Sequence, residues 1–489
     1  MTKKHKLRFL GILALISLTT LLGGCRTKEL RYRVGDRQTA WLYQNPFPIN
    51  NIGDPFVFRA GDGAYYLFAT SAPDGFYCWK SDDLVHWGTR KEAYLRRADS
   101  WGVENFWAPE VTERGGRYFL FYSAKTRGGS LRIGAAVSER PDGPYRDARN
   151  EPLFDFGYAA IDPDVLQDSD GQNYLFFSRD CSENTVGAVH TSEICGVRLS
   201  QDLLSVQGEP IRLTTPEQAW ETSSKNPLWN EGPEILKHNG LYYLTYSANC
   251  YAGRNYSVGY ATSRLPLGPY EKSKNNPILT AGMYEDISGP GHHSFVTSPD
   301  GEELLIAYHT HTFPEQGGGN RQLNLDRVIF SESGELHIDG PTISPQPIPS
   351  SRNFRNVALE AEFQCSGSKV SLLNDGIFAV HRKDEKLDWV QTAEEDGFVR
   401  VTAKWKQPRR IVGVCVYRGV HDSLDFQSLD LMFDGRYQIS DVRCPSPMEQ
   451  RSAAISFDPV SASEINFRFR PEKGQKQVAV SEIMIESAS

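Results

Sequence analysis

The sequence predicts an all-β chain made of two unlike parts. One hairpin pattern occurs five times between residues 53 and 308, strand-like segments without the repeat follow after residue 355, and long helical periodicity is absent from the repeated region. A single hairpin cannot bury its own apolar face, so repeated hairpins must stack on their neighbours. We therefore expect a five-bladed β-propeller followed by a C-terminal β-sandwich of the jelly-roll kind.

The first 25 residues predict an export signal that ends at a lipid-attachment site. Lys3 to Arg8 is basic, Phe9 to Leu22 is apolar but too short to span a membrane comfortably, and small residues precede Cys25. This pattern resembles a bacterial lipobox, which implies cleavage before Cys25 and its lipidation; an ordinary signal peptide with a coincidental cysteine is the alternative. Acyl chains would anchor the protein to a membrane of the bacterial cell envelope without spanning it.

The rest of the chain divides at changes of pattern. Residues 26–48 lack a convincing core pattern and are expected to be a tether, although the Trp41-Leu42-Tyr43 segment could pack on the first blade. Residues 49–345 carry the propeller, and the Pro-rich stretch beside residues 346–354 predicts a linker. Residues 355–489 predict the β-sandwich, which is either a carbohydrate-binding module or a structural support for the propeller.

Each repeat begins with a short motif, followed by an apolar strand, a glycine-containing turn and a second apolar strand. The five starts are Gly53-Asp54-Pro55, Trp107-Ala108-Pro109, Ile161-Asp162-Pro163, Glu231-Gly232-Pro233 and Gly291-His292-His293. In a propeller the first strand of every blade lies at the central axis. We therefore expect Asp54, Asp162 and Glu231 to meet at equivalent depth at one end of the channel.

Three carboxylates at the blade starts are the groups that inverting hydrolysis of a glycosidic bond needs. A base activates water, an acid protonates the leaving oxygen, and a third carboxylate can raise the pKa of the acid. An aspartate before a proline, taken alone, more often caps a turn. The presence of such acids on separate repeats favours catalysis. The further acids Glu110, Asp164 and Glu234 are expected to lie behind the reacting groups or in solvent.

These motifs, together with Asn105 to Glu110, resemble the signature of glycoside hydrolase family 43 over the whole propeller region. The resemblance implies that Asp54 is the general base, Asp162 the pKa modulator that also orients the acid, and Glu231 the general acid. It implies an inverting, exo-acting enzyme that removes α-L-arabinofuranosyl residues from plant cell-wall polysaccharide or oligosaccharide. The alternatives are a β-xylosidase, an arabinanase or a galactan-active hydrolase of the same family, and a non-catalytic glycan-binding surface lipoprotein.

The resemblance also singles out three residues beside the carboxylates. Trp107 resembles an aromatic wall of the sugar subsite, against a core tryptophan as the alternative. Arg321 resembles an arginine that approaches the modulator and the sugar, against a surface charge. His292 would face a structural calcium ion in the channel through water ligands, or be a hydrogen-bonded channel histidine. No cofactor is required for the hydrolysis itself.

The net charge and the cysteine spacing argue against two kinds of ligand, nucleic acid and zinc. The net charge is -8 and no basic stretch follows the N-terminus, so nucleic acid is not an expected partner. Seven cysteines remain besides Cys25, and none has CxxC spacing, so a zinc site is not expected either. Cys181 and Cys195 flank one short segment and could form a disulfide.

Overall fold

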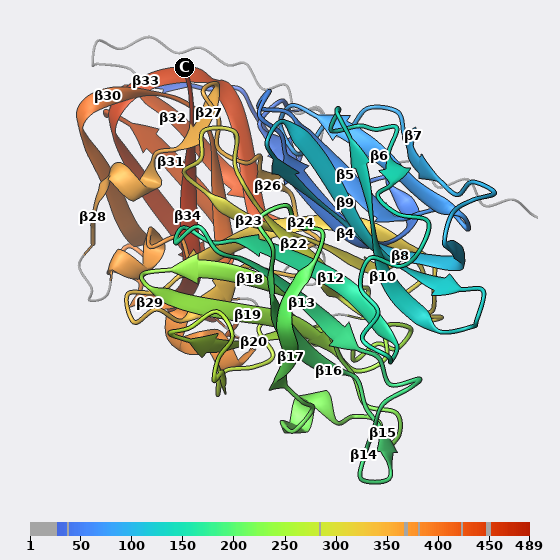
Figure 1. The fold of residues 1–489 in the computed structure, drawn as a ribbon. Coiled ribbons are helices and arrows are strands. Elements are labelled where there is room, and N and C mark those ends of the chain that lie inside the picture. The colour runs from blue at the N-terminus through green and yellow to red at the C-terminus, as the bar shows by residue number, and fades with distance from the viewer. Residues whose placement is uncertain are drawn as a thin grey trace, which may run out of the picture.

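The computed structural model describes residues 27–36, 39–282, 285–365, 370–379, 382–421, 424–445 and 451–489. These residues are built almost entirely from strands, arranged as a propeller and a sandwich that pack together (Figure 1). The expected export signal and its Cys25 lie outside the described residues. No helix in the described part of the chain is long and apolar enough to cross a membrane.

Five antiparallel blades of four strands each lie within the described residues, with blades 5 and 1 joined into one eight-stranded sheet, which confirms the predicted propeller. From the axis outward the strands are β4 (Asn50–Arg59), β5 (Tyr65–Thr70), β6 (Gly75–Ser81) and β7 (Lys91–Leu95) in blade 1; β8 (Gly102–Arg114), β9 (Arg117–Thr126), β10 (Leu131–Ser138) and β11 (Arg146–Asp147) in blade 2; β12 (Ala160–Gln167), β13 (Asn173–Arg179), β16 (Glu193–Leu199) and β17 (Val206–Thr214) in blade 3; β18 (Asn230–His238), β19 (Leu241–Ala248), β20 (Ser257–Ser263) and β21 (Glu271–Lys272) in blade 4; and β22 (Gly291–Thr297), β23 (Leu304–His311), β24 (Arg321–Phe330) and β25 (Leu336–Ile338) in blade 5. A small hairpin, β14 (Thr185–Val186) and β15 (Val189–His190), and the 3-10 helix η1 (Ala219–Glu221) extend from blade 3 and from the segment that joins it to blade 4.

The second strand of each blade explains why the repeats stack. These strands are rich in aromatic and β-branched residues and are buried on both faces, as the β5 sequence from Tyr65 to Ala69 illustrates. Each blade therefore needs apolar partners on two sides. Distinct apolar clusters fill the gaps between blades 1 and 2, 2 and 3, 3 and 4, 4 and 5, and 5 and 1.

The ring is closed by the segment that precedes β4. The Phe47 N–H donates to the Leu323 carbonyl over 2.9 Å, and the Leu323 N–H donates to the Ile49 carbonyl over 3.0 Å. Asn45 adds a side-chain bond of 2.8 Å to the Leu325 carbonyl. Residues 45–52 thus run beside β24 of blade 5, so the N-terminal end of the propeller pairs with its C-terminal end.

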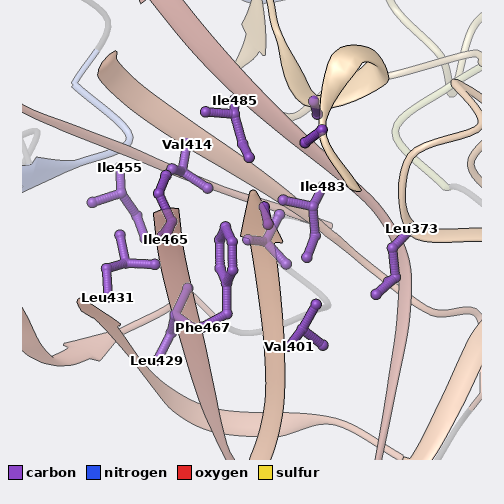
Figure 2. Packing of buried hydrophobic residues seen from close by; sticks show 14 of the residues in the cluster. Leu373, Val401, Val414, Leu429, Leu431, Ile455, Ile465, Phe467, Ile483 and Ile485 are labelled. Atoms are coloured by element: carbon purple, nitrogen blue, oxygen red, sulfur yellow. The ribbon is translucent and has the colours of Figure 1, made fainter. Parts of the chain in front are cut away.

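The sandwich contains long strands that belong to both of its layers. Its elements are β1 (Lys28–Glu29), β2 (Tyr32–Val34), β27 (Phe354–Asn356), η2 (Ala358–Glu360), β28 (Glu362–Gln364), η3 (Val370–Leu373), η4 (Arg382–Leu387), β29 (Trp389–Thr392), β30 (Val399–Arg418), β31 (Phe426–Phe433), β32 (Tyr437–Arg443), β33 (Ser452–Pro471) and β34 (Gln477–Ala488). β30 and β33 pair along most of their length, and register shifts near Arg409 and Gly413 let them bend from one layer to the other. Side chains from both halves of these strands meet in one core (Figure 2).

The expected tether is wrong, because residues 26–48 are largely part of the two folded domains. β1 pairs in parallel with β32, and β2 pairs antiparallel with β33 of the sandwich. Trp41 packs in the sandwich on Gly413, where a Cβ would lie 2.0 Å from its ring, and not on the first blade. Tyr43 does pack on the propeller, since its hydroxyl donates to the Leu325 carbonyl over 2.9 Å.

The expected linker is also ordered and mostly buried. β26 (Gln346–Pro347) pairs with β3 (Leu42–Tyr43) between the two domains. The Ser452 hydroxyl of the sandwich donates to the Pro345 carbonyl over 2.6 Å. The proline-rich stretch therefore joins the propeller to the sandwich through a shared strand pair instead of separating them.

The possible disulfide between Cys181 and Cys195 is not formed in the described part of the chain. Cys195 lies buried in β16, where it faces the apolar cluster between blades 2 and 3. Cys181 lies in the loop that follows β13, and its N–H donates to the Ser192 hydroxyl over 3.0 Å. Closeness in the sequence did not place the two sulfur atoms together.

Candidate active site

The first strand of every blade carries a bulge at its axial start. In each blade the register with the second strand shifts at a residue whose φ lies between 44 and 56°, in the left-handed region. These five residues are Asp54, Ala108, Asp162, Gly232 and His292. This conformation costs a residue with a side chain of order 1–3 kcal/mol and is found most often at functional sites. All five residues line one axial cavity of about 30 Å³.

Asp54 is buried among cationic and hydroxyl groups. Its Oδ1 lies 2.7 Å from Arg321 Nη1 and 3.3 Å from His292 Nδ1, and its Oδ2 accepts a hydrogen bond of 2.6 Å from the Thr70 hydroxyl. Burial by itself would raise the pKa of Asp54, but Arg321, and after it His292 and His309, hold this pKa well below its usual value. Asp54 is therefore an ionised carboxylate at neutral pH.

Glu231 has the opposite electrostatic environment. Burial raises the pKa of Glu231 well above its usual value, and the Asp162 carboxylate raises it further; the Tyr256 hydroxyl, which donates to Glu231 Oε1 over 2.9 Å, opposes both. Burial also raises the pKa of Asp162 to about 6, while the Gly232 N–H donates to Asp162 Oδ2 over 3.0 Å. An ionised carboxylate and a protonated carboxyl thus share one buried site, which is the pattern that inverting glycoside hydrolysis requires.

The three acids do not lie at equivalent depth, so that expectation is wrong. Asp54 and Asp162 are the bulge residues of their blades, whereas Glu231 stands one residue before the bulge of blade 4. Trp107 holds the same register position in blade 2. The acid therefore leaves the axial strand from a different backbone position than the two aspartates do.

Trp107 and Arg321 take up distinct positions around this centre. Trp107 is half-buried and packs against the small apolar cluster that contains Leu131 and Ile161. Arg321 is buried and forms its ion pair with Asp54, so it is not a surface charge and contacts the predicted base rather than the predicted modulator. Its guanidinium also lies 5.0 Å from the centre of the half-exposed Tyr251 ring.

His292 lies between the bulges of blades 1 and 4. Its Nδ1 faces Asp54, and a Cβ at Gly232 would lie only 3.1 Å from its ring, which explains why the bulge of blade 4 carries glycine. Among the described residues no group of three or more histidine, cysteine, aspartate or glutamate side chains could hold a metal ion directly. Calcium bound through water ligands in the channel stays a prediction.

The sequence analysis missed three residues of the site. Thr70 ends β5 and joins two blades, because its hydroxyl donates to Asp54 and also accepts from the Ala108 N–H over 2.9 Å. His309 accepts from the Asp54 N–H over 3.2 Å and stacks on Tyr256 with ring centres 5.6 Å apart. Thr70, His309 and Tyr256 all lie outside the repeated blade starts. The one available signal was a polar residue at the end of an otherwise apolar strand, and it applied to Thr70.

A second ring of polar side chains lies two residues beyond the bulges. Each side chain accepts a hydrogen bond from a backbone N–H of the next blade, namely Glu110 from Val165, Asp164 from Ile235, Glu234 from Phe295, and the Ser294 hydroxyl oxygen from Val57. Glu110 and Asp164 are buried and Glu234 is partly buried at the axial cavity, so none of the three is a solvent-exposed acid. Burial raises the pKa of Glu110 and of Glu234 well above the usual value, and that of Asp164 to about 8. These carboxyls link neighbouring blades through hydrogen bonds to the backbone.

Comparison with known proteins agrees with this geometry. The family model of glycosyl hydrolases family 43 matches residues 43–336. The chain is 46% identical to a thermostable family-43 glycoside hydrolase of known structure, with a TM-score of 0.61 over 63% of this chain and 99% of that one. It is 32% identical to the structure of an endo-1,4-β-xylanase from Bacteroides thetaiotaomicron, with a TM-score of 0.53 over 62% of this chain and 98% of that one.

Two relatives with named activities match the propeller region. The chain is 29% identical to a β-D-galactofuranosidase of Aspergillus niger over 57% of this chain and 79% of the relative. It is also 29% identical to an extracellular exo-α-(1→5)-L-arabinofuranosidase of Streptomyces chartreusis, over 56% of this chain and 84% of the relative. With the axial carboxylates, the propeller and the family match together, the chain belongs to glycoside hydrolase family 43 and is a glycosidase.

Proposed function

We propose that this glycosidase removes terminal α-L-arabinofuranosyl residues from plant cell-wall polysaccharide or oligosaccharide with inversion at the anomeric carbon. Asp54 takes a proton from the attacking water, and Glu231 protonates the leaving oxygen. Asp162 raises the pKa of Glu231 and, through Gly232, fixes the backbone beside it. The observation that carries the proposal is the contrast between an ionised Asp54 and a protonated Glu231 in one buried site.

The surroundings of the two carboxyls support these roles. Arg321 and Thr70 hold both oxygens of Asp54 in place, which fixes the direction in which a water molecule could be deprotonated. Trp107 occupies in blade 2 the register position that Glu231 has in blade 4 and is partly exposed, which suits an apolar wall for a bound sugar.

The choice of a furanoside rests on the named relatives, of which one acts on α-L-arabinofuranosides and another on β-D-galactofuranosides. The two sugars share the configuration of the five-membered ring and differ in the exocyclic carbon chain. β-D-Galactofuranosides are therefore the second candidate substrate, ahead of the β-xylosides, arabinan and galactan that the family also admits.

The direct test is hydrolysis of aryl α-L-arabinofuranosides, β-D-galactofuranosides, β-D-xylosides and β-D-galactosides by the purified protein, with the product anomer followed by NMR. We expect one furanoside to be cleaved to the inverted product, and Asp54→Asn to lower kcat by at least about a thousandfold. Glu231→Gln should lose most activity on substrates with poor leaving groups. Retention of configuration, or full activity of Asp54→Asn, would exclude the assigned roles.

We further propose that Cys25 carries the lipid that anchors the enzyme in the cell envelope. The support is the sequence pattern alone, since Cys25 lies outside the described residues. Metabolic labelling with a palmitate analogue should label the wild-type protein and not Cys25→Ala. Equal labelling of the wild-type protein and Cys25→Ala would contradict the proposal, because the lipid would then not be attached to Cys25.

A further inference from the structure

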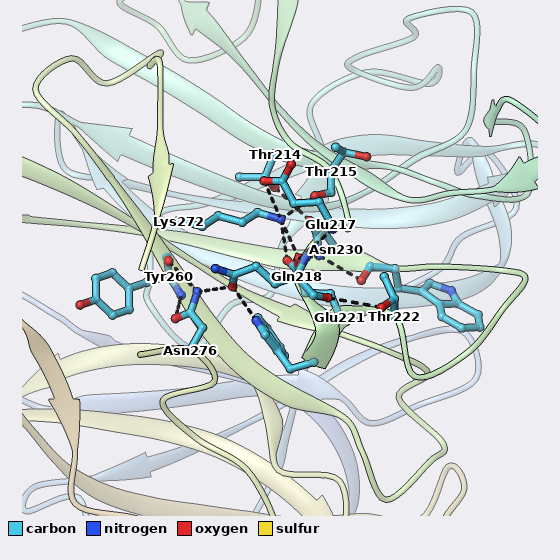
Figure 3. Close-up of polar contacts among 12 residues, drawn as sticks. Thr214, Thr215, Glu217, Gln218, Glu221, Thr222, Asn230, Tyr260, Lys272 and Asn276 are labelled. Atoms are coloured by element: carbon cyan, nitrogen blue, oxygen red, sulfur yellow. Dashed lines mark hydrogen bonds and ion pairs between the residues drawn. The ribbon is translucent and has the colours of Figure 1, made fainter. Parts of the chain in front are cut away.

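A buried ion pair joins blade 4 to the segment that precedes it (Figure 3). Lys272, in the outermost strand of blade 4, places its Nζ 2.7 Å from Glu221 Oε1 and 2.8 Å from Glu221 Oε2, and the side chains are 7% and 0% exposed. The Gln218 N–H also donates to Glu221, over 2.6 Å. Removing one partner of a buried, fully hydrogen-bonded ion pair destabilises a protein strongly, because the other charge is left buried and unpaired.

The ion pair is joined to the residue immediately before Glu231. Asn230 is fully buried, and its Nδ2 donates to Glu221 Oε1 over 3.1 Å while its Oδ1 accepts from the Thr214 hydroxyl over 3.3 Å. Its backbone N–H donates to the Ser192 carbonyl over 3.0 Å. Besides its pairing with β19, Asn230 is thus held by groups of blade 3 and of the segment that contains η1.

The same short helix also holds the loop that carries the hydrogen-bond partner of Glu231. Asn249 Nδ2 donates to the Trp220 carbonyl of η1 over 2.8 Å and to the Asn255 carbonyl over 2.9 Å. Tyr256 follows directly, and its hydroxyl donates to Glu231 Oε1. η1 is therefore connected both to the backbone of the acid and to the hydroxyl group that its carboxyl contacts.

We propose that Glu221, the buried acceptor of the Lys272–Glu221 ion pair, is the positioning residue for the general acid. Its carboxyl accepts from Asn230 and from the backbone of η1, and η1 holds the loop before Tyr256. Asn230 and this loop set the backbone and the carboxyl direction of Glu231. The assignment rests on the proposed role of Glu231 as acid. Neither Lys272 nor Glu221 touches the substrate, so both act through Asn230 and Tyr256. Small displacements of a catalytic group are costly, because proton transfer requires close alignment.

The test compares two neutral replacements of the ion pair. Glu221→Leu with Lys272→Met removes both charges and the acceptor for Asn230, whereas Glu221→Gln with Lys272→Met removes both charges and keeps an acceptor. The control is Asp168→Leu with Lys237→Met, which removes an ion pair of 2.6 Å at the far end of β18. Asn230→Ala, which leaves the ion pair intact, serves as a second variant if the Leu/Met protein does not fold.

The readout is the ratio of kcat/KM for nitrophenyl and phenyl α-L-arabinofuranosides, because a poor leaving group depends on the acid and a good one does not. We expect this ratio to rise about 10- to 100-fold in the Leu/Met and Asn230→Ala variants, and to stay within about threefold of wild type in the Gln/Met variant and the control. An equal loss on both substrates would show a merely structural role and overturn the proposal.

Crystal structures of the variants separate this inference from the proposed function. If the wild-type protein cleaves no glycoside, the proposed function fails, but the contact between Tyr256 and Glu231 Oε1, 2.9 Å here, can still be measured. The contact should be lost in the Leu/Met variant and kept in the Gln/Met variant. Its survival in both would show that the acceptor at Glu221 does not position Glu231.

Discussion

Replacing Tyr256 by phenylalanine removes the hydroxyl that donates to Glu231, together with its hydrogen bond to the Ser247 side chain, and keeps the ring. The ring is fully buried, stacks on His309 with an interplanar angle of 5°, and has no space beneath it, because a Cβ on Gly291 would lie 2.4 Å from it. Phenylalanine keeps these contacts. The variant therefore isolates the hydroxyl group that donates to the acid over 2.9 Å.

The size of the effect follows from that hydrogen bond. A bond to an ionised carboxylate is worth about 1.5–3 kcal/mol and one to a neutral carboxyl about 1 kcal/mol, so the hydroxyl favours the ionised form by roughly 1 kcal/mol. Its removal therefore raises the pKa of Glu231 further. Since the acid must be protonated to act, the alkaline limb of the pH profile moves upward. Loss of orientation should lower kcat by about 5- to 30-fold.

The assay is kcat/KM for phenyl α-L-arabinofuranoside between pH 4 and pH 10, with Tyr145→Phe as the control. Tyr145 is equally buried, but its hydroxyl donates to the Pro141 carbonyl in blade 2, away from the site. An alkaline limb that stays in place in Tyr256→Phe, or that moves to lower pH, would refute the reasoning. So would an equal shift in the control.

Three further changes have defined outcomes. Gly291→Ala should displace the Tyr256 ring and reproduce the lower kcat of Tyr256→Phe. The control Gly301→Ala, at an exposed turn, should lower stability but leave kcat unchanged. Melting curves and kinetics of both variants check this. Asp164 is protonated in the folded state, with a pKa of about 8, but ionised in the unfolded chain above about pH 4, so the wild type should lose stability as pH rises from 5 to 8. Urea titrations should show a smaller loss of unfolding free energy for Asp164→Asn. An equal pH dependence of the two proteins would mean that this carboxyl is not protonated. Deletion of residues 27–36 should lower the Tm of the sandwich, since β1 and β2 pair with it; an unchanged Tm would contradict that pairing.

The sequence predicted the blades well because the hairpin pattern is local. Each start, turn and second strand lie within about 25 residues of one another, so the alternation of glycine, aromatic and β-branched residues predicts them directly. The family resemblance of the blade starts added the three carboxylates. That these residues meet follows from the ring, which places every first strand at the axis.

What the sequence did not reveal depends on distant partners. The sequence shows Glu231 one residue further from its proline than Asp54 is, but the bulge that gives this offset its meaning is defined by the strand opposite. The pairing of Lys28 with Tyr437 joins two ends of the chain that no periodicity connects. The same holds for Lys272 and Glu221, which read as ordinary surface residues until the fold encloses them.

The contacts of the N-terminal segment set the order in which the chain can fold during synthesis. Residues 45–52 can close the ring only after Leu323 and Leu325 have left the ribosome, and Tyr32 can find its partner Phe457 only near the end of translation. Blades 1 to 4 must therefore exist for a time as an open stack with unpaired edges. Neither domain can therefore be completed until almost all of the chain has been made, which suits the export that we propose for this protein.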